Sequence, residues 1–398
     1  MRTGLPWILG AWFLAVTPLF AQTPLPSPPN PPAFVPTVPE GPVTSFAQPP
    51  VPDTFRFWVR AEYLSYWVKN TPLPISLVTG DPNNPTQELL NSDRSFGMFS
   101  GFRVGFGGWL DPNNDLGLEA NFFSLNRRAR QFSASSDGTG SPILAFPFVN
   151  QDPSQVGNNL FTIAMPGVFD GSVVVTSSLE LWGAEANGVI SLVRQRDFEL
   201  TALIGFRYVD LRETLNISTV SSALTTNPNT VLFQSDQFNT RNQFYGGQVG
   251  GRFSWQGDRF ALDVTGKLAL GATHQTVDIS GFSAQTGPGG PNGVFPGGFF
   301  TQPSNIGHFT ANQFGLIPSV EMKFYWLLTS RLRAFVGYDF MYWNQVVRPG
   351  SQVDRNINLN QTGTVFNNGP SGPAFPTPLF ARTDFWAQGV TLGFEFRF

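Results

Sequence analysis

The sequence predicts an all-β protein, a single antiparallel transmembrane β-barrel of about ten strands with short periplasmic turns and long extracellular loops. Three observations predict it. Apolar residues recur at every second position through most of the chain after residue 55, as in strands with one apolar and one polar face. The connections between these segments are alternately short and long, as in bacterial outer-membrane barrels. The segments have 13 to 20 residues, enough for a tilted spanning strand of roughly 9 to 11 residues.

The composition excludes several other classes of protein. Charged residues make up 13% of the 398 residues, against roughly 25% in typical soluble proteins. No apolar run after the N-terminal segment reaches the roughly 20 residues that a membrane helix needs. The net charge of −3 argues against a nucleic-acid partner. Because the chain has no Cys and two His residues, no disulfide, metal site or cofactor is predicted.

Residues 1–21 have the features of a secretory signal peptide. Arg2 precedes an apolar stretch at residues 5–16, and the small residue Ala21 stands before the expected cleavage point. The alternative is a short membrane anchor. Residues 22–54 contain 12 prolines, a composition that favours extended polyproline II and cannot bury a core. We therefore expect a periplasmic linker at 22–54, or a segment that docks onto a partner, and a barrel at 55–398.

The alternation places the ten strands and the connections between them. We expect strands at approximately 55–68, 98–110, 115–127, 173–192, 198–212, 241–255, 259–277, 313–327, 331–345 and 384–398. Five connections are long: residues 69–97, 128–172, 213–240, 278–312 and 346–383. Two further strands within these loops would make the barrel twelve-stranded. An even number of strands puts both ends of the barrel chain on the periplasmic side.

Aromatic residues near strand ends are expected to form the interfacial girdles of a membrane barrel: Tyr66, Trp67, Phe102, Phe106, Trp109, Tyr338, Tyr342, Trp343, Phe385 and Trp386. The last residue, Phe398, ends a strand of alternating aromatic residues, which is the usual signal for outer-membrane assembly. The predicted partners are therefore membrane lipid and the outer-membrane barrel assembly machinery. No homo-oligomeric state is predicted.

Three stretches resemble the bacterial beta-barrel porin family 7. They are residues 56–68 (RFWVRAEYLSYWV) with 71–79 (TPLPISLVT), residues 181–188 (LWGAEANG) with 203–213 (LIGFRYVDLRE), and residues 389–398 (GVTLGFEFRF). The resemblance extends over nearly all of residues 55–398. It implies an outer-membrane barrel with a porin role and brings no catalytic or ligand residues of its own.

The non-aliphatic positions of each strand are taken to face the lumen, where they give a nearly balanced charged lining. The lumen-lining residues are Arg60, Glu62, Arg103, Glu119, Glu185, Arg207, Arg252, Asp263, Lys267, Glu321, Lys323, Arg333, Asp339, Glu395 and Arg397. Buried charges must pair or be hydrated. Two interpretations follow: a salt-bridge network that fills and stiffens the barrel, or a hydrated path with weak ion selectivity. Ten strands lie near the size at which side chains can fill the interior.

The first functional prediction is passage of small solutes through a narrow porin in the outer membrane, reached by signal-peptide export. The alternative is a non-conducting structural or adhesive barrel whose long loops contact the cell surroundings. The apolar stretch at residues 159–165 (NLFTIAM) is unusual for a solvated loop. Our hypothesis is that it folds into the lumen or packs on the rim as a constriction.

Two further interpretations are weighed and disfavoured. His274, Asp278, Asp210 and Glu213 lie near the expected outer rim, but no nucleophile motif accompanies them, so an enzyme is not predicted. A soluble sandwich or two-domain secreted protein is disfavoured, because long structureless loops argue against a compact soluble domain.

Overall fold

The computed structural model describes residues 56–73, 75–81, 84–90, 93–362 and 370–398. The predicted signal peptide and proline-rich linker lie outside these residues. In the described part of the chain, no helix is long and apolar enough to cross a membrane.

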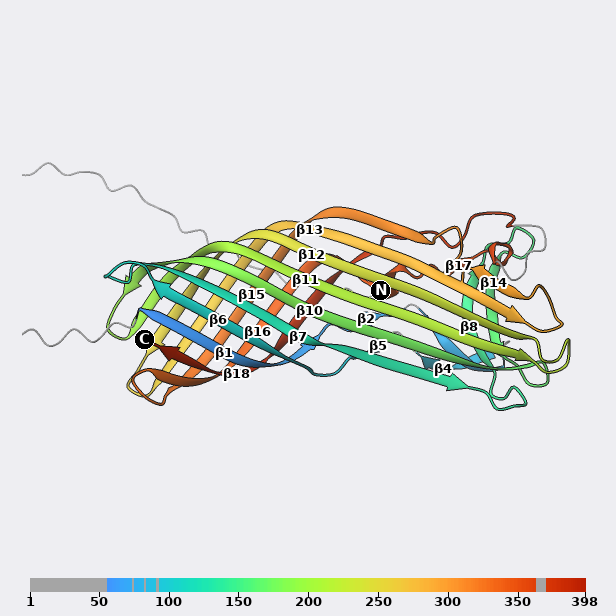
Figure 1. Ribbon diagram of the computed structural model, residues 1–398, viewed down its shortest axis with the longest axis horizontal. Coiled ribbons are helices and arrows are strands. Elements are labelled where there is room, and N and C mark those ends of the chain that lie inside the picture. Colours follow the sequence, from blue (N-terminus) through green and yellow to red (C-terminus); the bar gives the residue numbers. More distant parts are fainter. Residues whose placement is uncertain (1–55, 74, 82–83, 91–92, 363–369) are drawn as a thin grey trace, which may run out of the picture. The chain divides into compact units, whose positions relative to one another are not determined.

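Ten strands form one antiparallel sheet that closes on itself (Figure 1). They are β1 (Phe57–Val68), β6 (Phe99–Trp109), β7 (Leu116–Ser135), β10 (Phe169–Arg194), β11 (Phe198–Ala223), β12 (Val231–Gln256), β13 (Phe260–Thr286), β15 (Gly307–Leu327), β16 (Leu332–Val347) and β18 (Arg382–Arg397). Each strand pairs with the next one along the chain, and β18 pairs with β1 to complete the ring. This arrangement confirms the predicted ten-stranded barrel, and where all ten strands pair, closure leaves no free sheet edge.

Shorter elements lie within the longer connections. They are β2 (Thr71–Pro72), β3 (Leu77–Asp81), β4 (Asn84–Leu90), β5 (Asp93–Arg94), β8 (Leu144–Asn150), β9 (Gly157–Ala164), β14 (Gly293–Pro296), η1 (Pro349–Gln352), β17 (Asn356–Ile357) and η2 (Leu359–Gln361). A second sheet joins β17, β8, β3 and β4, and β9 pairs with β8. Segments from three long connections are therefore held together by backbone hydrogen bonds.

The central strands are much longer than the sequence pattern predicted. β11 continues to Ala223 and β12 begins at Val231, so most of the expected loop at 213–240 is strand. The prediction stopped too early because the outward and inward sides of each strand exchange their polarity part-way along it. The outward side of β11 is first apolar, at Leu200, Ile204 and Phe206. Farther along, the apolar residues point inward, and the outward positions are polar.

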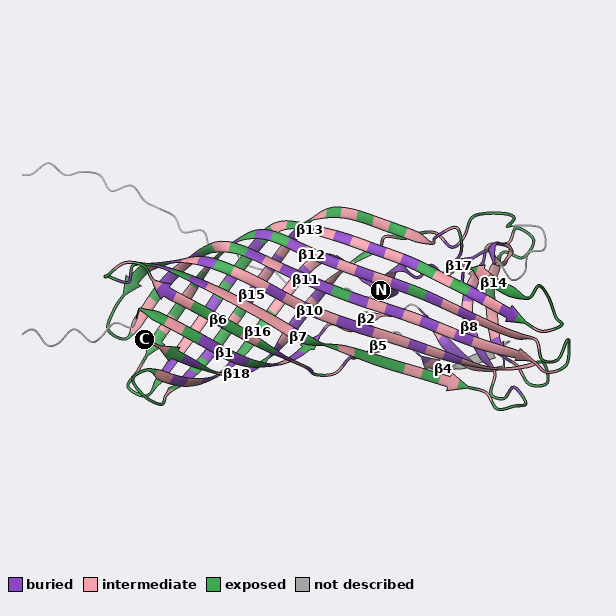
Figure 2. Cartoon of the chain, viewed as in Figure 1, coloured by how far each residue is buried: buried purple, intermediate pink, exposed green. Residues whose placement is uncertain are grey.

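The apolar outward positions form a belt that fits a membrane. On β11 the belt covers residues 198–208 and on β12 residues 245–255, which matches the roughly 9 to 11 residues of a tilted spanning strand. Figure 2 shows the exposed and buried residues alternating along these strands. Exposed Phe, Leu and Ile side chains in such numbers are stable only in an apolar solvent, so we take this belt as the membrane-spanning part.

A row of aromatic rings marks the outer boundary of the belt. The rings of Phe102, Phe122, Trp182, Tyr208 and Tyr245 follow one another across five neighbouring strands, with centroids 4.9 to 6.0 Å apart. The Tyr208 hydroxyl donates to Asp210 at 3.0 Å, as expected for a ring with one apolar and one wet end.

Three residues predicted for the girdles do not belong to them. Tyr66, Trp343 and Phe385 are buried on the inner face of the ring and are at most 4% exposed. The prediction was wrong for these residues because it assigned every strand-end aromatic residue to the lipid face. Inside the barrel, the same residues pack in an apolar core.

A charge on the outward side of β11 tests the position of the belt. We expect Ile204→Arg, in the middle of residues 198–208, to lower the free energy of unfolding by about 2–4 kcal/mol in lipid. Ser218→Arg, on the same side of β11 beyond the belt, is the matched control and should cost less than about 1 kcal/mol. Denaturant titration of both variants in lipid vesicles checks this, and equal losses would contradict the boundary.

Candidate functional site: the barrel lumen

All ten strands of the ring contribute to the charged lining predicted from the sequence. Of the fifteen predicted residues, all but Asp263 make at least one ion pair. Most of these side chains are largely buried, and the Glu119 side chain has no exposed surface. We call this set the charge layer. It lies at the level of the membrane belt.

Several ion pairs of the charge layer cross the lumen. Arg252 on β12 reaches Glu119 on β7 with an Nη2–Oε2 distance of 2.7 Å. Lys323 on β15 reaches Glu62 on β1 with an Nζ–Oε1 distance of 2.6 Å. Each pair joins strands that are three positions apart in the ring. These contacts span the lumen between strands that are not neighbours, so paired charges occupy this part of the interior.

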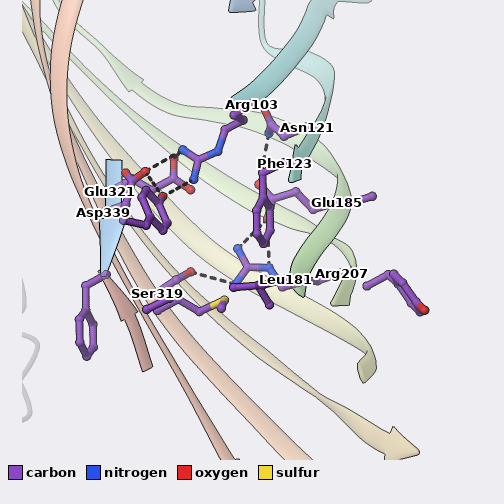
Figure 3. A pocket seen from close by; sticks show the side chains of 15 residues that line it. Arg103, Asn121, Phe123, Leu181, Glu185, Arg207, Ser319, Glu321 and Asp339 are labelled. Carbon is purple, nitrogen blue, oxygen red and sulfur yellow. Dashed lines mark hydrogen bonds and ion pairs between the residues drawn. The ribbon is translucent and has the colours of Figure 1, made fainter. Parts of the chain in front are cut away.

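Figure 3 shows the centre of this layer. Arg103 points toward Asp339 and Glu321, with Nη1–oxygen distances of 3.0 and 3.7 Å. Arg207 binds Glu185 through Nη2 at 2.6 Å and donates to the Ser319 hydroxyl at 3.0 Å. The cavity between these groups has a volume of about 50 Å³, room for a few water molecules.

A second cavity lies at the end of the layer where β1 begins and β18 ends. Its volume is about 120 Å³, and its lining includes Asp263, Arg252, Arg333 and Glu395. Asp263 therefore faces the lumen without joining an ion pair of its own. Both of these cavities are small, about 50 and 120 Å³.

Beyond the belt, the lumen is filled by a plug with an apolar core and a few buried charges. Inward-facing residues of the long strands, among them Val173, Leu215, Ile217, Phe238 and Val277, pack against residues from the long connections. The connections contribute Leu73, Ile75, Leu77, Phe146, Phe148, Ile163, Phe299, Phe300, Val353 and Ile357. We call these inserted segments the plug. Its rings gather around Phe299, which stacks on Phe161 with centroids 4.0 Å apart.

The apolar stretch at residues 159–165 is part of this plug. Most of it forms β9, which pairs with β8 in a hairpin. Ile163 is fully buried, and its carbonyl oxygen accepts a hydrogen bond from the Ser221 hydroxyl of β11 at 2.8 Å. The stretch therefore lies inside the barrel, one of the two positions that the hypothesis allowed.

One buried ion pair fastens the plug to the barrel wall. Arg348, at the end of β16, is fully buried and contacts Glu213 on β11 with an Nη2–Oε1 distance of 2.6 Å. Its Nη1 also donates to the backbone oxygen of Asn70 at 2.7 Å, and its Nη2 to the Thr71 hydroxyl at 3.0 Å. Arg348 thus holds three separate parts of the chain together.

A second anchor is Asp236 on β12. Its carboxylate accepts hydrogen bonds from the backbone N–H groups of Phe299, Phe300 and Thr301 and from the Thr301 hydroxyl, at 2.7 to 3.2 Å. Burial raises the pKa of Asp236 to about 6, and these hydrogen bonds oppose the rise. Because the folded state then binds a proton more readily than the unfolded state, this group's contribution to stability falls as the pH rises from about 4 to about 6.

Sequence reasoning missed both anchors. Arg348 carried one signal, since it is a lone charge between Val346, Val347 and Pro349 at the end of a strand. Asp236 lay within an expected loop and carried none. Glu213 was considered only as a rim carboxylate.

The histidines and rim carboxylates make separate contacts with different partners. His274 contacts the Asn312 side chain, and His308 contacts Asp278. Asp210 faces outward, where Arg212, Arg241 and Tyr208 surround it, whereas Glu213 faces inward. Among the described residues, no three His, Cys, Asp or Glu side chains are grouped so as to hold a metal ion.

The C-terminal residue completes the ring at its periplasmic end. Phe57 and Phe398 exchange two backbone hydrogen bonds of 2.9 Å, and their rings stack with centroids 5.8 Å apart. Phe398 remains 52% exposed on the lipid side.

Comparison with known proteins identifies the family. Residues 58–398 match the model of the family described as Putative beta barrel porin-7 (BBP7). The chain belongs to this family. The resemblance found in the sequence is therefore confirmed. No curated protein sequence matches the chain.

Solved structures with some similarity include two bacterial membrane proteins. The outer membrane protease OmpT from Escherichia coli is 10% identical, with a TM-score of 0.42, over 87% of this chain and 98% of that one. The P. putida toluene transporter TodX is 9% identical, with a TM-score of 0.20, over 86% of this chain and 90% of that one. At these scores, neither structure bears on the activity of this chain.

Neutralising one carboxylate of the charge layer tests whether its pairs are structural. Glu395 accepts hydrogen bonds from the Arg333 and Arg397 guanidinium groups, and it is 2% exposed. We expect Glu395→Gln to lower the free energy of unfolding by about 3–5 kcal/mol, because buried guanidinium groups lose their counter-charge. Glu199→Gln, which removes an accessible partner of Arg194, is the control and should cost about 0–1 kcal/mol. Denaturant titration measures both, and similar losses would show that the layer is hydrated and loosely paired.

A double-mutant cycle tests the anchor between Arg348 and Glu213. Arg348→Met alone should weaken the plug by about 3–5 kcal/mol, since it leaves a buried carboxylate unpaired. Adding Glu213→Leu should recover a large part of the lost free energy, because the carboxylate that was left unpaired is then absent. Amide hydrogen exchange of β8 and η1 reports the local opening energy. Additive effects of the two substitutions would contradict direct coupling.

Proposed function

We propose that this protein is an outer-membrane barrel that is closed to solutes in its resting form, and whose long outer half contacts the cell surroundings. The observation that carries the proposal is the closure of one lumen by two consecutive and chemically different layers. The charge layer occupies the membrane level, and the apolar plug occupies the outer half.

The energetics favour a closed resting state. Breaking a buried ion pair by removing one partner costs about 3–5 kcal/mol, and a solute path through the charge layer requires several pairs to separate together. The plug adds a barrier of another kind, because an ion that enters an apolar core loses its hydration. The outward side of the long strands is polar beyond the belt, at positions such as Asn216, Ser218, Gln237 and Asn239, and it is exposed to water.

A second candidate is the narrow porin predicted first, with weak ion selectivity. The family description as a porin supports it, and so does the near balance of eight basic and seven acidic residues in the lining, since a lining of one sign would select strongly. In this proposal, solutes pass only after the plug has moved away from the inward-facing residues of the long strands.

We also propose the route by which the protein reaches its membrane and the partners that it meets there. Residues 1–21 direct export, and the exposed Phe398 at the end of β18 presents the assembly signal to the barrel assembly machinery. Membrane lipid covers the belt. We propose no catalytic activity, because the histidines, half-buried His274 and exposed His308, point away from the lumen and contact Asn312 and Asp278.

Single-channel conductance of variants in planar bilayers tests whether the charge layer and the plug each close the lumen. The wild-type mature protein should give no current steps. Deleting residues 144–164 removes the β8–β9 hairpin, and replacing Glu62, Arg103, Lys323 and Asp339 by Ala opens the charge layer. Either change alone should give little current, and the two together should give discrete, weakly ion-selective steps.

The control for the deletion is removal of residues 225–228, in the turn between β11 and β12, which should leave the bilayer silent. Heat-modifiable migration in gels verifies that each variant is folded. Discrete steps from the wild-type protein would reject the closed resting form and favour the narrow porin.

A further inference from the structure

Above the membrane belt, β7 continues without its neighbour β6. The last paired residues are Leu125 on β7 and Gly101 on β6, whereas β7 extends to Ser135. Two arginines connect β7 with the segment that leads into β6. Arg128 donates to the backbone oxygen of Met98, and Arg130 Nε donates to that of Phe96 at 3.1 Å.

A cavity of about 410 Å³ lies beside this part of β7, within the size range of small-molecule sites. One part of its lining is apolar and comes from Leu73, Leu90, Phe96, Phe132 and Val175. The other part is polar and includes Arg130, Ser177 and Thr71. The cavity therefore has a mixed apolar and polar lining, and it is much larger than the two cavities described in the charge layer.

The polar part of the lining includes hydrogen-bond donors that the described residues leave without a full set of partners. Arg130 and Ser177 are directly paired across β7 and β10, so their side chains lie on the same side of the sheet. The Ser177 hydroxyl is buried and has no hydrogen-bond partner among the described residues. Arg130 is exposed, and no described carboxylate lies within ion-pair distance of its guanidinium, whose one hydrogen bond is to Phe96. Every arginine of the charge layer, in contrast, has a carboxylate partner.

We infer that this cavity binds an anionic amphiphile. A carboxylate or similar anionic head accepts hydrogen bonds from the free guanidinium nitrogens of Arg130 and from the Ser177 hydroxyl. The apolar tail occupies the space between Leu73, Leu90 and Val175. Because the cavity lies beyond the aromatic row that ends the belt, the ligand comes from the outer surroundings or from the adjacent lipid leaflet. The inference does not depend on whether the lumen conducts.

Titration with dodecanoate tests this inference. The mature protein is placed in nanodiscs of zwitterionic phosphatidylcholine, so that no detergent competes, and binding is measured by calorimetry. We expect one saturable site per chain and a loss of affinity of tenfold or more in Arg130→Met, since charge-assisted hydrogen bonds are lost. Arg127→Met is the matched control, because Arg127 lies three residues away on β7 and donates to Ser178. Its affinity should equal that of the wild type.

Two further measurements distinguish binding at the cavity from nonspecific partition of dodecanoate into the lipid, and identify the source of the ligand. Ser177→Leu removes the unpartnered hydroxyl and adds bulk beside Arg130, so it should also weaken binding. Dodecanol should bind far more weakly than dodecanoate. If anionic phosphatidylglycerol in the nanodisc competes with dodecanoate in the wild type, the site takes membrane lipid. If it does not, the site takes the free amphiphile.

Equal affinity of Arg130→Met and Arg127→Met, equal binding of dodecanol, or no saturable binding would overturn the inference. Heat-modifiable migration shows that each variant is folded.

Discussion

Each long strand of this barrel crosses from lipid into water. That change of solvent determines which residues are apolar and which are polar on its outward and inward sides. Where the outward side meets lipid, it must be apolar, and the inward side is left to polar and charged residues. Where the outward side meets water, it is polar, and the apolar residues turn inward. On β11 the change occurs near Tyr208: Ile204 and Phe206 are exposed on one side of it, and Leu211 and Leu215 are fully buried on the other.

The two filled layers of the lumen follow from this exchange. Most inward-facing charges in the belt are largely buried, so they pair across the ring, as Arg252 does with Glu119. Inward-facing apolar residues beyond the belt need an apolar partner. The long connections supply it by folding back into the barrel, where Arg348 and Asp236 fix them with polar contacts. The connections are therefore part of the core of the protein, and the same exchange leaves room for the cavity beside Arg130 where β6 ends early.

The sequence was sufficient for the ring and for its charged lining, because alternation with a period of two is a local property. The strands around Glu395 and Lys323 could be recognised in this way. The plug could not, since Phe146, Phe299 and Ile357 come together only through the closed ring and lie far apart in the chain. The outer halves of β11 and β12 were taken for loops because the apolar side of a strand was assumed to be its lipid side. Tyr66 and Trp343 were misassigned for the same reason.

The exchange of faces along β11 can be measured directly, because the chain has no native cysteine. Single cysteines at residues 200–218 would carry a nitroxide spin label, and collision rates with oxygen and with a water-soluble nickel chelate would be recorded in lipid vesicles. We predict high collision rates with oxygen at even positions up to 208. At even positions from 212 onward, we predict high collision rates with the nickel chelate. Odd positions should be inaccessible to both reagents throughout. High nickel collision at odd positions such as 211, 215 and 217 would show a water-filled lumen and contradict the closed, two-layer interior.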